Sequence, residues 1–567
     1  MKNNLQYEKS LYLRQHSENP LNWISLRENP FEKASAENKP VFISIGYSAC
    51  HWCHVMSRET FCNEEIADYL NTHFISVKID REEYPDIDKK YQFYLQIIRT
   101  HGGWPLSVFT DFEGVPFYGG TYFPPKRSRG LPSFIEVLRT VHDLYHNDKR
   151  RLLTIKDNYR KILAQYKAVS DDPVDVKSVI RSFELKISEI LDFENGGLVG
   201  NTKFPNVPVL LALLEPAVIN LPGIKDFLIK TANILCTSGI YDHINGGFFR
   251  YCVDAHWNVP HFEKMLYDNA LNVIFLSRMY INTDNRLYLN AINHTFEFLF
   301  DEFFTEDGFV ASLNAESKDE KGENVEGYYY IAGEDMFEGL SGGSLELLAQ
   351  EIFIKDGVIN LNRDISPKDL NLIHDILGNI AIKKEKPSID NKIILSWNGL
   401  LATAMFEFFE ASSDEFYLNA GLNLVNKIVS NFTDGKSFFR IRYEDSLFEH
   451  WTLEDFAFIL QSVIKAYDIS KHKPLLITAK FIFESAIKIF YKEGVLYYDK
   501  KQEVLETFDE AVFSAFGVFF ECWTYLKDYV EEEDKYEKVN LFAVDRLNKY
   551  PLSHPTIYRV LSKLNHG

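Results

Sequence analysis

PVFISIGYSACHWCHVMSRETF, residues 40–61, is the stretch that decides how the first part of the chain folds. Its apolar run Val41–Ile45 predicts a short buried strand that ends at Gly46. A Cys-x-x-Cys pair, Cys50 and Cys53, follows the strand, and the residues after the pair can form a helix. A thiol at a helix N-terminus faces unpaired backbone N–H groups and the positive end of the helix dipole, which stabilise its thiolate. The order strand, turn, Cys-x-x-Cys and helix therefore predicts a reactive pair of sulfurs.

This order of elements is typical of the thioredoxin-like fold. The start of a helix can lower a cysteine pKa from about 8.5 to roughly 3.5–7.5, so that the thiol is ionised at neutral pH. We predict that the Cys50 thiolate attacks a substrate disulfide and that Cys53 then resolves the mixed disulfide. Both cysteines are therefore predicted catalytic residues.

Three other interpretations of the same residues stay open. Cys50 to His54 spells C-x-x-C-H, the attachment signature of c-type haem, but no segment typical of a signal peptide precedes it. Cys50, His51, Cys53 and His54 carry the atom types of zinc ligands, but a structural site usually draws on a second Cys-x-x-Cys, which the sequence lacks. The third interpretation is a thioredoxin-like fold without redox activity. We expect the redox role, with no metal and no cofactor.

The segments around the pair alternate between helix and strand, as expected for an α/β domain of the thioredoxin-like class. Residues 102–105 precede one of the strands, and Pro105 is the candidate for the cis-proline that receives a bound peptide in this fold. Trp104 and Pro105 are therefore predicted substrate-binding residues, with an ordinary trans Trp-Pro turn as the alternative. Helices are predicted at 31–38, 64–70, 86–98 and 132–166, and strands at 41–45, 74–80, 106–110 and 116–120.

The composition indicates a globular chain of 567 residues, 46% hydrophobic and 25% charged. The net charge of −20 argues against a nucleic-acid partner, because a nucleic-acid backbone is itself anionic. No apolar run approaches the roughly 18 residues that a spanning helix needs, so we expect no membrane partner. Six cysteines in so long a chain do not form a disulfide framework, and the N-terminus lacks an apolar signal region. The sequence therefore predicts a cytoplasmic protein.

A second domain is predicted beyond residues 170–173, a polar segment that interrupts the helical pattern, so the domains are 1–168 and 169–567. Glycine turns recur there at steps of about 50 to 60 residues, with one step about twice as long, enough for two helices per repeat. Six such hairpins predict a closed, all-α (α/α)6 toroid, with an open helical solenoid as the alternative. The turns contain Gly197, Gly247, Gly308, Gly435 and Gly494, and an altered turn is expected at Asp356-Gly357.

Specific motifs run through both predicted domains: LYLRQH at 11–16, KPVFISIGYS at 39–48, CHWCHVM at 50–56, KIDREEYPD at 78–86, GGTYFPP at 119–125, PHFEKMLYDN at 260–269 and WNGL at 397–400. Together they resemble the spermatogenesis-associated (YyaL-type) proteins, which join a thioredoxin-like domain to a six-hairpin toroid. That toroid is similar to N-acylglucosamine epimerases and six-hairpin glycosidases, so the resemblance implies carbohydrate binding or isomerisation. This sequence departs from the family pattern at residues 314–317, where Asn-Ala-Glu-Ser replaces Asp-Ala-Asp-Ser.

A sugar isomerase or epimerase needs an acid and a base to move a proton beside a carbonyl group. Each candidate for these roles has a plain structural explanation as well, either as a hydrogen-bonded core histidine or as a carboxylate at a helix start. A glycosidase would instead need two carboxylates roughly 5–9 Å apart. The predicted catalytic residues of the toroid are His243, His261, Glu263 and Asp268, and the predicted substrate-binding residues are Trp257, Glu316, Trp397 and Asp455.

Three functional hypotheses follow from the sequence. The first is a thiol–disulfide oxidoreductase that uses Cys50 and Cys53 on a protein disulfide. The second is a sugar isomerase or epimerase that acts on a small carbohydrate in the toroid. The third is a binding protein without catalytic activity.

Overall fold

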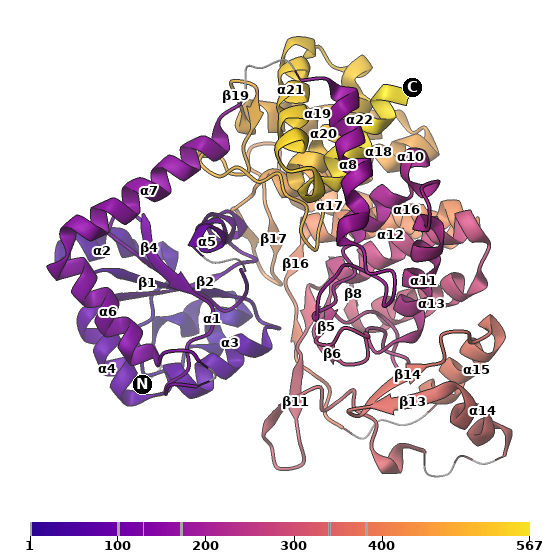
Figure 1. Cartoon of the computed structure of the whole chain (residues 1–567), viewed down its shortest axis with the longest axis horizontal. Coiled ribbons are helices and arrows are strands. Elements are labelled where there is room, and N and C mark those ends of the chain that lie inside the picture. Colours follow the sequence, from indigo (N-terminus) through magenta and orange to yellow (C-terminus); the bar gives the residue numbers. More distant parts are fainter. Residues whose placement is uncertain are drawn as a thin grey trace. The chain divides into compact units, whose positions relative to one another are not determined.

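The computed structural model separates into two compact units, Met1–Val169 and Ser170–Gly567 (Figure 1). The predicted break at 170–173 lies outside the described residues. Within the described residues, no helix combines the length and apolar character that a bilayer crossing requires. The structure describes residues 3–98, 102–128, 130–169, 174–337, 340, 342–379 and 384–566.

The first unit is built on a four-stranded sheet in the order β2-β1-β3-β4. β1 pairs in parallel with β2 and antiparallel with β3, which in turn pairs antiparallel with β4. Every residue of β1 is buried, as the apolar run of the sequence predicted. The strands are β1 (Val41–Gly46), β2 (Ile75–Asp80), β3 (Leu106–Thr110) and β4 (Pro116–Gly120).

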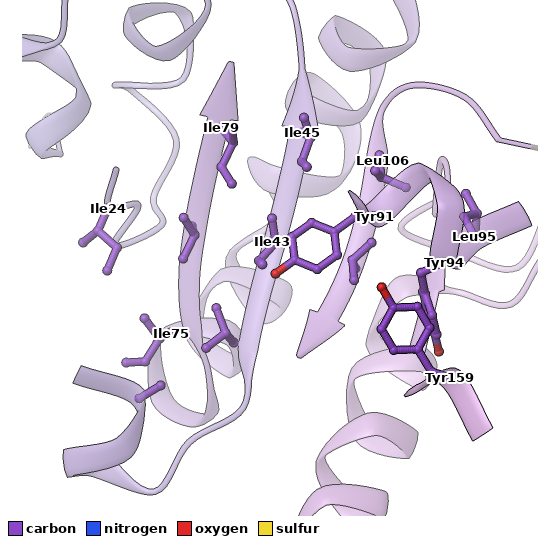
Figure 2. Packing of buried hydrophobic residues seen from close by; sticks show 14 residues of the cluster. Ile24, Ile43, Ile45, Ile75, Ile79, Tyr91, Tyr94, Leu95, Leu106 and Tyr159 are labelled. Carbon is purple, nitrogen blue, oxygen red and sulfur yellow. The ribbon is translucent and has the colours of Figure 1, made fainter. Parts of the chain in front are cut away.

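Helices cover the two faces of this sheet, and alternate strand residues point to opposite faces. On one face, Ile43, Ile45 and Leu106 pack against Tyr91 and Tyr159, and Figure 2 shows this cluster. On the other face of the sheet, several aromatic rings pack around Phe42. The helices are α1 (Leu11–Gln15), α2 (Pro30–Glu37), α3 (His51–Met56), α4 (Glu64–His73), α5 (Pro85–Ile98), α6 (Phe134–Asn147) and α7 (Lys149–Lys167).

The single long helix predicted for residues 132–166 is wrong, because the segment forms the two helices α6 and α7. The break lies at Asp148, whose side chain accepts a hydrogen bond from the Arg151 backbone N–H and so caps α7. Amphipathic periodicity continues through both helices, and the pattern alone therefore did not show the break.

The second unit closes into a ring of six inner helices, in which each helix contacts the next and α22 returns to contact α9. This closure confirms the predicted (α/α)6 toroid and excludes the open solenoid. Six outer helices pack around the ring. The inner helices are α9 (Val207–Leu213), α12 (Leu266–Thr283), α16 (Leu395–Ser412), α18 (Leu453–Ser470), α20 (Ala515–Leu526) and α22 (Pro555–His566), and the outer helices are α8 (Val176–Lys186), α11 (Ile224–Thr237), α13 (Arg286–Phe298), α17 (Glu415–Phe432), α19 (Lys473–Phe490) and α21 (Glu533–Lys549).

The five glycine turns each lie between an outer helix and the inner helix that follows it. The long step between Gly308 and Gly435 does not mark an altered turn, which corrects the prediction. It arises because the connection from α13 to α16 carries an insertion of hairpins and helices. Asp356 and Gly357 join two strands of that insertion, β13 (Ile352–Lys355) and β14 (Val358–Leu361). The sixth hairpin, α21–α22, has no glycine turn.

A buried lysine stabilises each of the first two glycine turns. Lys203 Nζ donates to Asp192 Oδ2 (2.7 Å) and to the Gly196 carbonyl (3.1 Å). Lys264 Nζ donates in the same way to Asp242 Oδ2 (2.6 Å) and to a turn carbonyl (2.7 Å). Both lysines are fully buried, so the ammonium groups form part of the core of the toroid.

Candidate functional site

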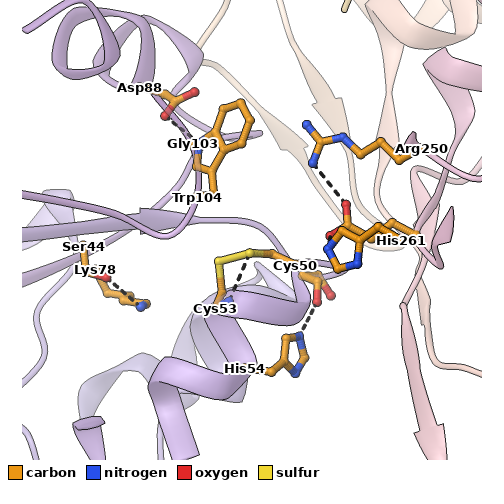
Figure 3. Close-up of a disulfide and its surroundings, with 12 residues drawn as sticks. Ser44, Cys50, Cys53, His54, Lys78, Asp88, Gly103, Trp104, Arg250 and His261 are labelled. Carbon is orange, nitrogen blue, oxygen red and sulfur yellow. Dashed lines mark hydrogen bonds and ion pairs between the residues drawn. A yellow bond between two sulfur atoms is a disulfide. The ribbon is translucent and has the colours of Figure 1, made fainter. Parts of the chain in front are cut away.

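The two predicted redox cysteines are joined by a disulfide at the start of α3 (Figure 3). Their Cα atoms lie 5.3 Å apart. Cys50 is the N-cap of α3, and its sulfur accepts a hydrogen bond of 3.2 Å from the Cys53 backbone N–H. This is the contact that stabilises a Cys50 thiolate once the bond is reduced.

Pro105 lies beside the pair, because the register pairs Ile45 with Leu106 and so places the end of β1 next to the start of β3. The Trp104–Pro105 peptide bond is cis, as predicted. Trp104 Nε1 donates to Asp88 Oδ1 (2.9 Å), and the Arg81 guanidinium lies 3.9 Å from the centre of the Trp104 ring. These contacts fix the orientation of the Trp104 side chain, and Figure 3 shows its bond to Asp88.

Lys78 is a buried lysine that the sequence analysis did not predict as part of the site. It lies on the face of the sheet that carries Phe42. Lys78 Nζ donates to Ser44 Oγ (3.0 Å), the residue opposite it in the β1–β2 register (Figure 3). The rings of Tyr12, Trp23 and Phe61 surround the ammonium group at 4.8–5.1 Å. Burial lowers the pKa of Lys78 well below its usual range. The only sequence signal was a lysine within an otherwise buried strand.

Gly46 is needed where the strand meets the disulfide. A β-carbon on this residue would lie 2.4 Å from Tyr12 Oη and 2.6 Å from Cys53 Sγ, closer than atoms approach without displacement. We expect Gly46→Ala to lower the unfolding free energy by about 3 kcal/mol, because overpacking forces its neighbours apart. Urea unfolding of the oxidised protein measures the change. Gly343→Ala, whose β-carbon meets no atom within 4 Å and whose φ lies outside the left-handed region, is the control for the loss of a glycine. Equal stabilities of Gly46→Ala and wild type would contradict this packing.

In the toroid, the structure brings His261 and Glu263 together. His261 Nε2 lies 3.2 Å from Glu263 Oε1, and the other ring nitrogen contacts the Glu326 carboxylate. Arg250 pairs with the second oxygen of Glu263 at 3.1 Å. Burial alone would lower the pKa of His261, but the Glu263 and Glu326 carboxylates outweigh it and raise this pKa to about 9. His261 is therefore a proton donor at neutral pH rather than a base.

The predicted Glu316 belongs to the same cluster, because it lies opposite Glu326 in the pairing of β11 (Glu316–Lys318) with β12 (Asn324–Glu326). Asp455 pairs instead with Arg440, at 2.6 Å. The Asp455 side chain also closes a capping box with Thr452 at the start of α18. This agrees with the structural explanation offered by the sequence, a carboxylate at a helix start.

The remaining predicted residues make other contacts. Asp268 lies in the first turn of α12, and the neighbouring Tyr267 ring packs edge-on against Trp397 at 4.7 Å. Trp257 is fully buried, with its indole N–H bonded to the Asn195 carbonyl, so no face is open for stacking on a sugar. His243 lies in a buried group of rings with His294 and His374, and burial lowers its pKa to about 4.

The charge on His261 gives the toroid a predictable pH dependence. An unfolded histidine has a pKa of about 6.5, so the contribution of His261 to stability is complete below that pH and is lost as the pH rises through about 9. We expect the urea midpoint of the toroid to fall over this range in wild type and less in His261→Gln. His472→Gln, which removes an exposed histidine, is the control. Equal slopes in all three proteins would contradict the charged state of His261.

A cavity of about 210 Å³ lies inside the ring, at the end formed by the C-terminal halves of the inner helices. None of the predicted toroid site residues lines it. No local sequence pattern predicts this cavity, because its lining comes from helix positions that are far apart in the chain. Its charged lining residues are Arg278, Glu407, Lys465, Asp468, Glu521, Arg559 and Lys563.

Comparison with known proteins gives relatives over both units. Residues 2–164 match the family described as "Thioredox_DsbH: Protein of unknown function, DUF255". The chain is 29% identical to "Uncharacterized protein B0495.5" of Caenorhabditis elegans, covering 100% of this chain and 86% of that protein. It is 28% identical to human "Spermatogenesis-associated protein 20", covering 99% and 80%. Among solved structures, a D-mannose isomerase aligns with 70% of this chain and 100% of its own at 11% identity and a TM-score of 0.45.

Proposed function

We propose that this chain, which is similar over almost its whole length to the spermatogenesis-associated proteins and joins a thioredoxin-like domain to a six-hairpin toroid, is a thiol–disulfide oxidoreductase. The observation that carries the proposal is the disulfide of Cys50 and Cys53, with Cys50 at the N-cap of α3. A cis-proline lies on the adjoining strand end, where a peptide substrate would pair with the backbone.

The chemistry is a two-electron exchange with a protein disulfide. In the reduced protein, the Cys50 thiolate attacks one sulfur of the substrate disulfide, and the substrate's other sulfur leaves as a thiolate. Cys53 then attacks Cys50, releases the second substrate thiolate and re-forms the Cys50–Cys53 disulfide that the structure contains. The substrate gains two electrons and the cysteine pair loses them.

The other cysteines support this proposal and a cytosolic setting. Cys62, Cys236, Cys252 and Cys522 are free thiols, although three of them are buried. Disulfides in cytosolic proteins are usually transient and catalytic, whereas structural disulfides predominate in secreted proteins. One disulfide in a Cys-x-x-Cys, beside four free cysteines, fits the catalytic kind. Burial raises the pKa of Cys236, Cys252 and Cys522, so these thiols do not compete as nucleophiles.

Trapping the mixed disulfide tests the proposal. Reduced Cys53→Ser protein, offered a peptide that contains one disulfide, is expected to accumulate a covalent adduct at Cys50, because no resolving thiol remains. Cys50→Ser protein should form none. Cys62→Ser, which removes an exposed cysteine outside the pair, should reduce the peptide as wild type does. An adduct at Cys62, or none in Cys53→Ser, would refute the proposal.

A second function, proton transfer on a small carbohydrate in the toroid, is supported by the pairing of His261 with Glu263 and Glu326. A histidine that is protonated at neutral pH, beside two carboxylates, supplies an acid next to potential bases. Aldose–ketose interconversion by wild type, its loss in His261→Gln and its persistence in Cys50→Ser would support this activity. Absence of turnover across a panel of aldoses would exclude those sugars as substrates and leave a binding role for the toroid.

A further inference from the structure

The hydroxyl group of Tyr12 is buried and has no hydrogen-bond partner among the described residues. Tyr12 lies in α1, whose N-cap residue Ser10 donates from Oγ to Asp80 Oδ2 (2.7 Å) and so attaches the helix to β2. Buried polar atoms without a partner are uncommon in folded proteins, so this hydroxyl requires an explanation.

The geometry at Gly46 shows what the hydroxyl faces. A β-carbon there would lie 2.4 Å from Tyr12 Oη and 2.6 Å from Cys53 Sγ, so both atoms border the space that the glycine leaves open and lie within 5.0 Å of each other. In the disulfide, Cys53 Sγ is bonded to Cys50 and carries no charge, so it is a weak acceptor.

We propose that the Tyr12 hydroxyl donates a hydrogen bond to the Cys53 sulfur when the disulfide opens, and thereby stabilises the reduced pair. This inference rests on the proposed oxidoreductase function and adds a residue to its site. A thiolate of an external dithiol attacks Cys50 Sγ, the Cys50–Cys53 bond breaks, and its electron pair passes to Cys53 Sγ. The second thiolate of the dithiol then displaces Cys50, so the dithiol becomes a disulfide and the pair has gained two electrons.

The negative charge that appears on Cys53 supplies the acceptor that the Tyr12 hydroxyl lacks in the oxidised protein. Burial, with Asp80 and Asp88 adding to it, raises the pKa of Tyr12 well above its usual range, so the hydroxyl keeps its proton at neutral pH. Two other ionisable groups lie beside the ring, His16 at 5.0 Å and Lys78 at 5.0 Å. Burial lowers the pKa of both groups.

Tyr12→Phe tests this role, since it removes only the oxygen. We expect the redox equilibrium of the full-length protein with glutathione to shift about tenfold toward the disulfide, which is about 30 mV for a two-electron couple. The oxidised form should keep its thermal stability, because its hydroxyl has no partner to lose, while the reduced form should melt at a lower temperature. Tyr91→Phe is the control, because it removes a buried hydroxyl that bonds to the Gly114 carbonyl (3.2 Å) elsewhere in the same domain.

Tyr91→Phe should lower the stability of both redox forms and leave the equilibrium with glutathione unchanged. Equal redox equilibria in Tyr12→Phe and wild type, or an equal loss of stability in the two redox forms of Tyr12→Phe, would overturn the inference. These readouts need no turnover. A protein that fails to reduce peptide disulfides but still shows the Tyr12→Phe shift would refute the proposed function and leave the Tyr12 contact standing.

Discussion

Replacing Cys50 with serine is expected to lower thiol–disulfide turnover by at least about 100-fold, because a serine hydroxyl cannot form the mixed disulfide on which the exchange depends. The fold should survive the change. Serine has almost the same size as cysteine and is a favoured N-cap residue, so it can accept the same Cys53 N–H bond at the start of α3. Reduction of a peptide disulfide by a dithiol, followed with and without the protein, measures the effect.

The burial of the pair shapes this result. Cys50 and Cys53 have 2% and 1% of their surfaces exposed, so a partner's sulfur reaches Cys50 only after neighbouring side chains move. We therefore compare Cys50→Ser with Cys62→Ser under the same conditions, since Cys62 is the exposed cysteine. If turnover survives in Cys50→Ser and falls in Cys62→Ser, the reactive thiol is Cys62, and the assignment of the chemistry to the Cys50–Cys53 pair is wrong.

Replacing Lys264 with methionine is expected to destabilise the toroid by about 3–5 kcal/mol, the usual result of removing one partner from a buried ion pair. The loss is large because Asp242, which is 4% exposed, would keep a carboxylate without its counter-ion, and the Gly246 carbonyl would lose a donor. Burial would raise the pKa of Asp242, but Lys264 outweighs it and keeps this pKa below its usual value. Urea unfolding of the full-length protein, followed by helix signal, measures the change.

Two other lysine variants are compared with Lys264→Met. Lys203→Met removes the equivalent ammonium from the preceding turn, so it should have a similar effect. Lys471→Met breaks an exposed pair with Asp468 and should change stability little, because solvent screens such pairs. If Lys264→Met lowered the unfolding free energy no more than Lys471→Met does, the conclusion that the buried lysines stabilise the glycine turns would be wrong.

Local signals in the sequence predicted most of the fold. The apolar run at 41–45, followed by the Cys-x-x-Cys, predicted the first strand and the start of the helix after it. The sequence Trp104-Pro105 predicted the cis peptide bond. The recurring glycine turns predicted the hairpin repeat. Gly197 and Gly247 have positive φ values of 67° and 82°, which glycine adopts most readily, so these turns are visible in the sequence as glycines. Each of these features is decided by a few neighbouring residues.

The features that the sequence did not show depend on long-range pairing. Lys78, Lys203 and Lys264 are buried only because distant groups accept their hydrogen bonds, and an isolated lysine in a sequence predicts exposure. The insertion between α13 and α16 lengthens one repeat, and the spacing of the glycine turns alone predicts an altered turn there. Among the toroid candidates, His261 contacts Glu326 and Glu316 lies opposite it. Glu326 belongs to a β-hairpin that the sequence periodicity did not predict.

The central claim is that Cys50 is a nucleophile made reactive by its position at the start of α3. The most direct test is the rate of alkylation of Cys50 against pH in the fully reduced Cys62→Ser protein, with the modified residue identified by mass spectrometry. We predict a midpoint below about 7.5, the upper end of the range for cysteines at helix starts. A midpoint near the ordinary thiol value of about 8.5, or a Cys50 that reacts only after unfolding, would contradict it.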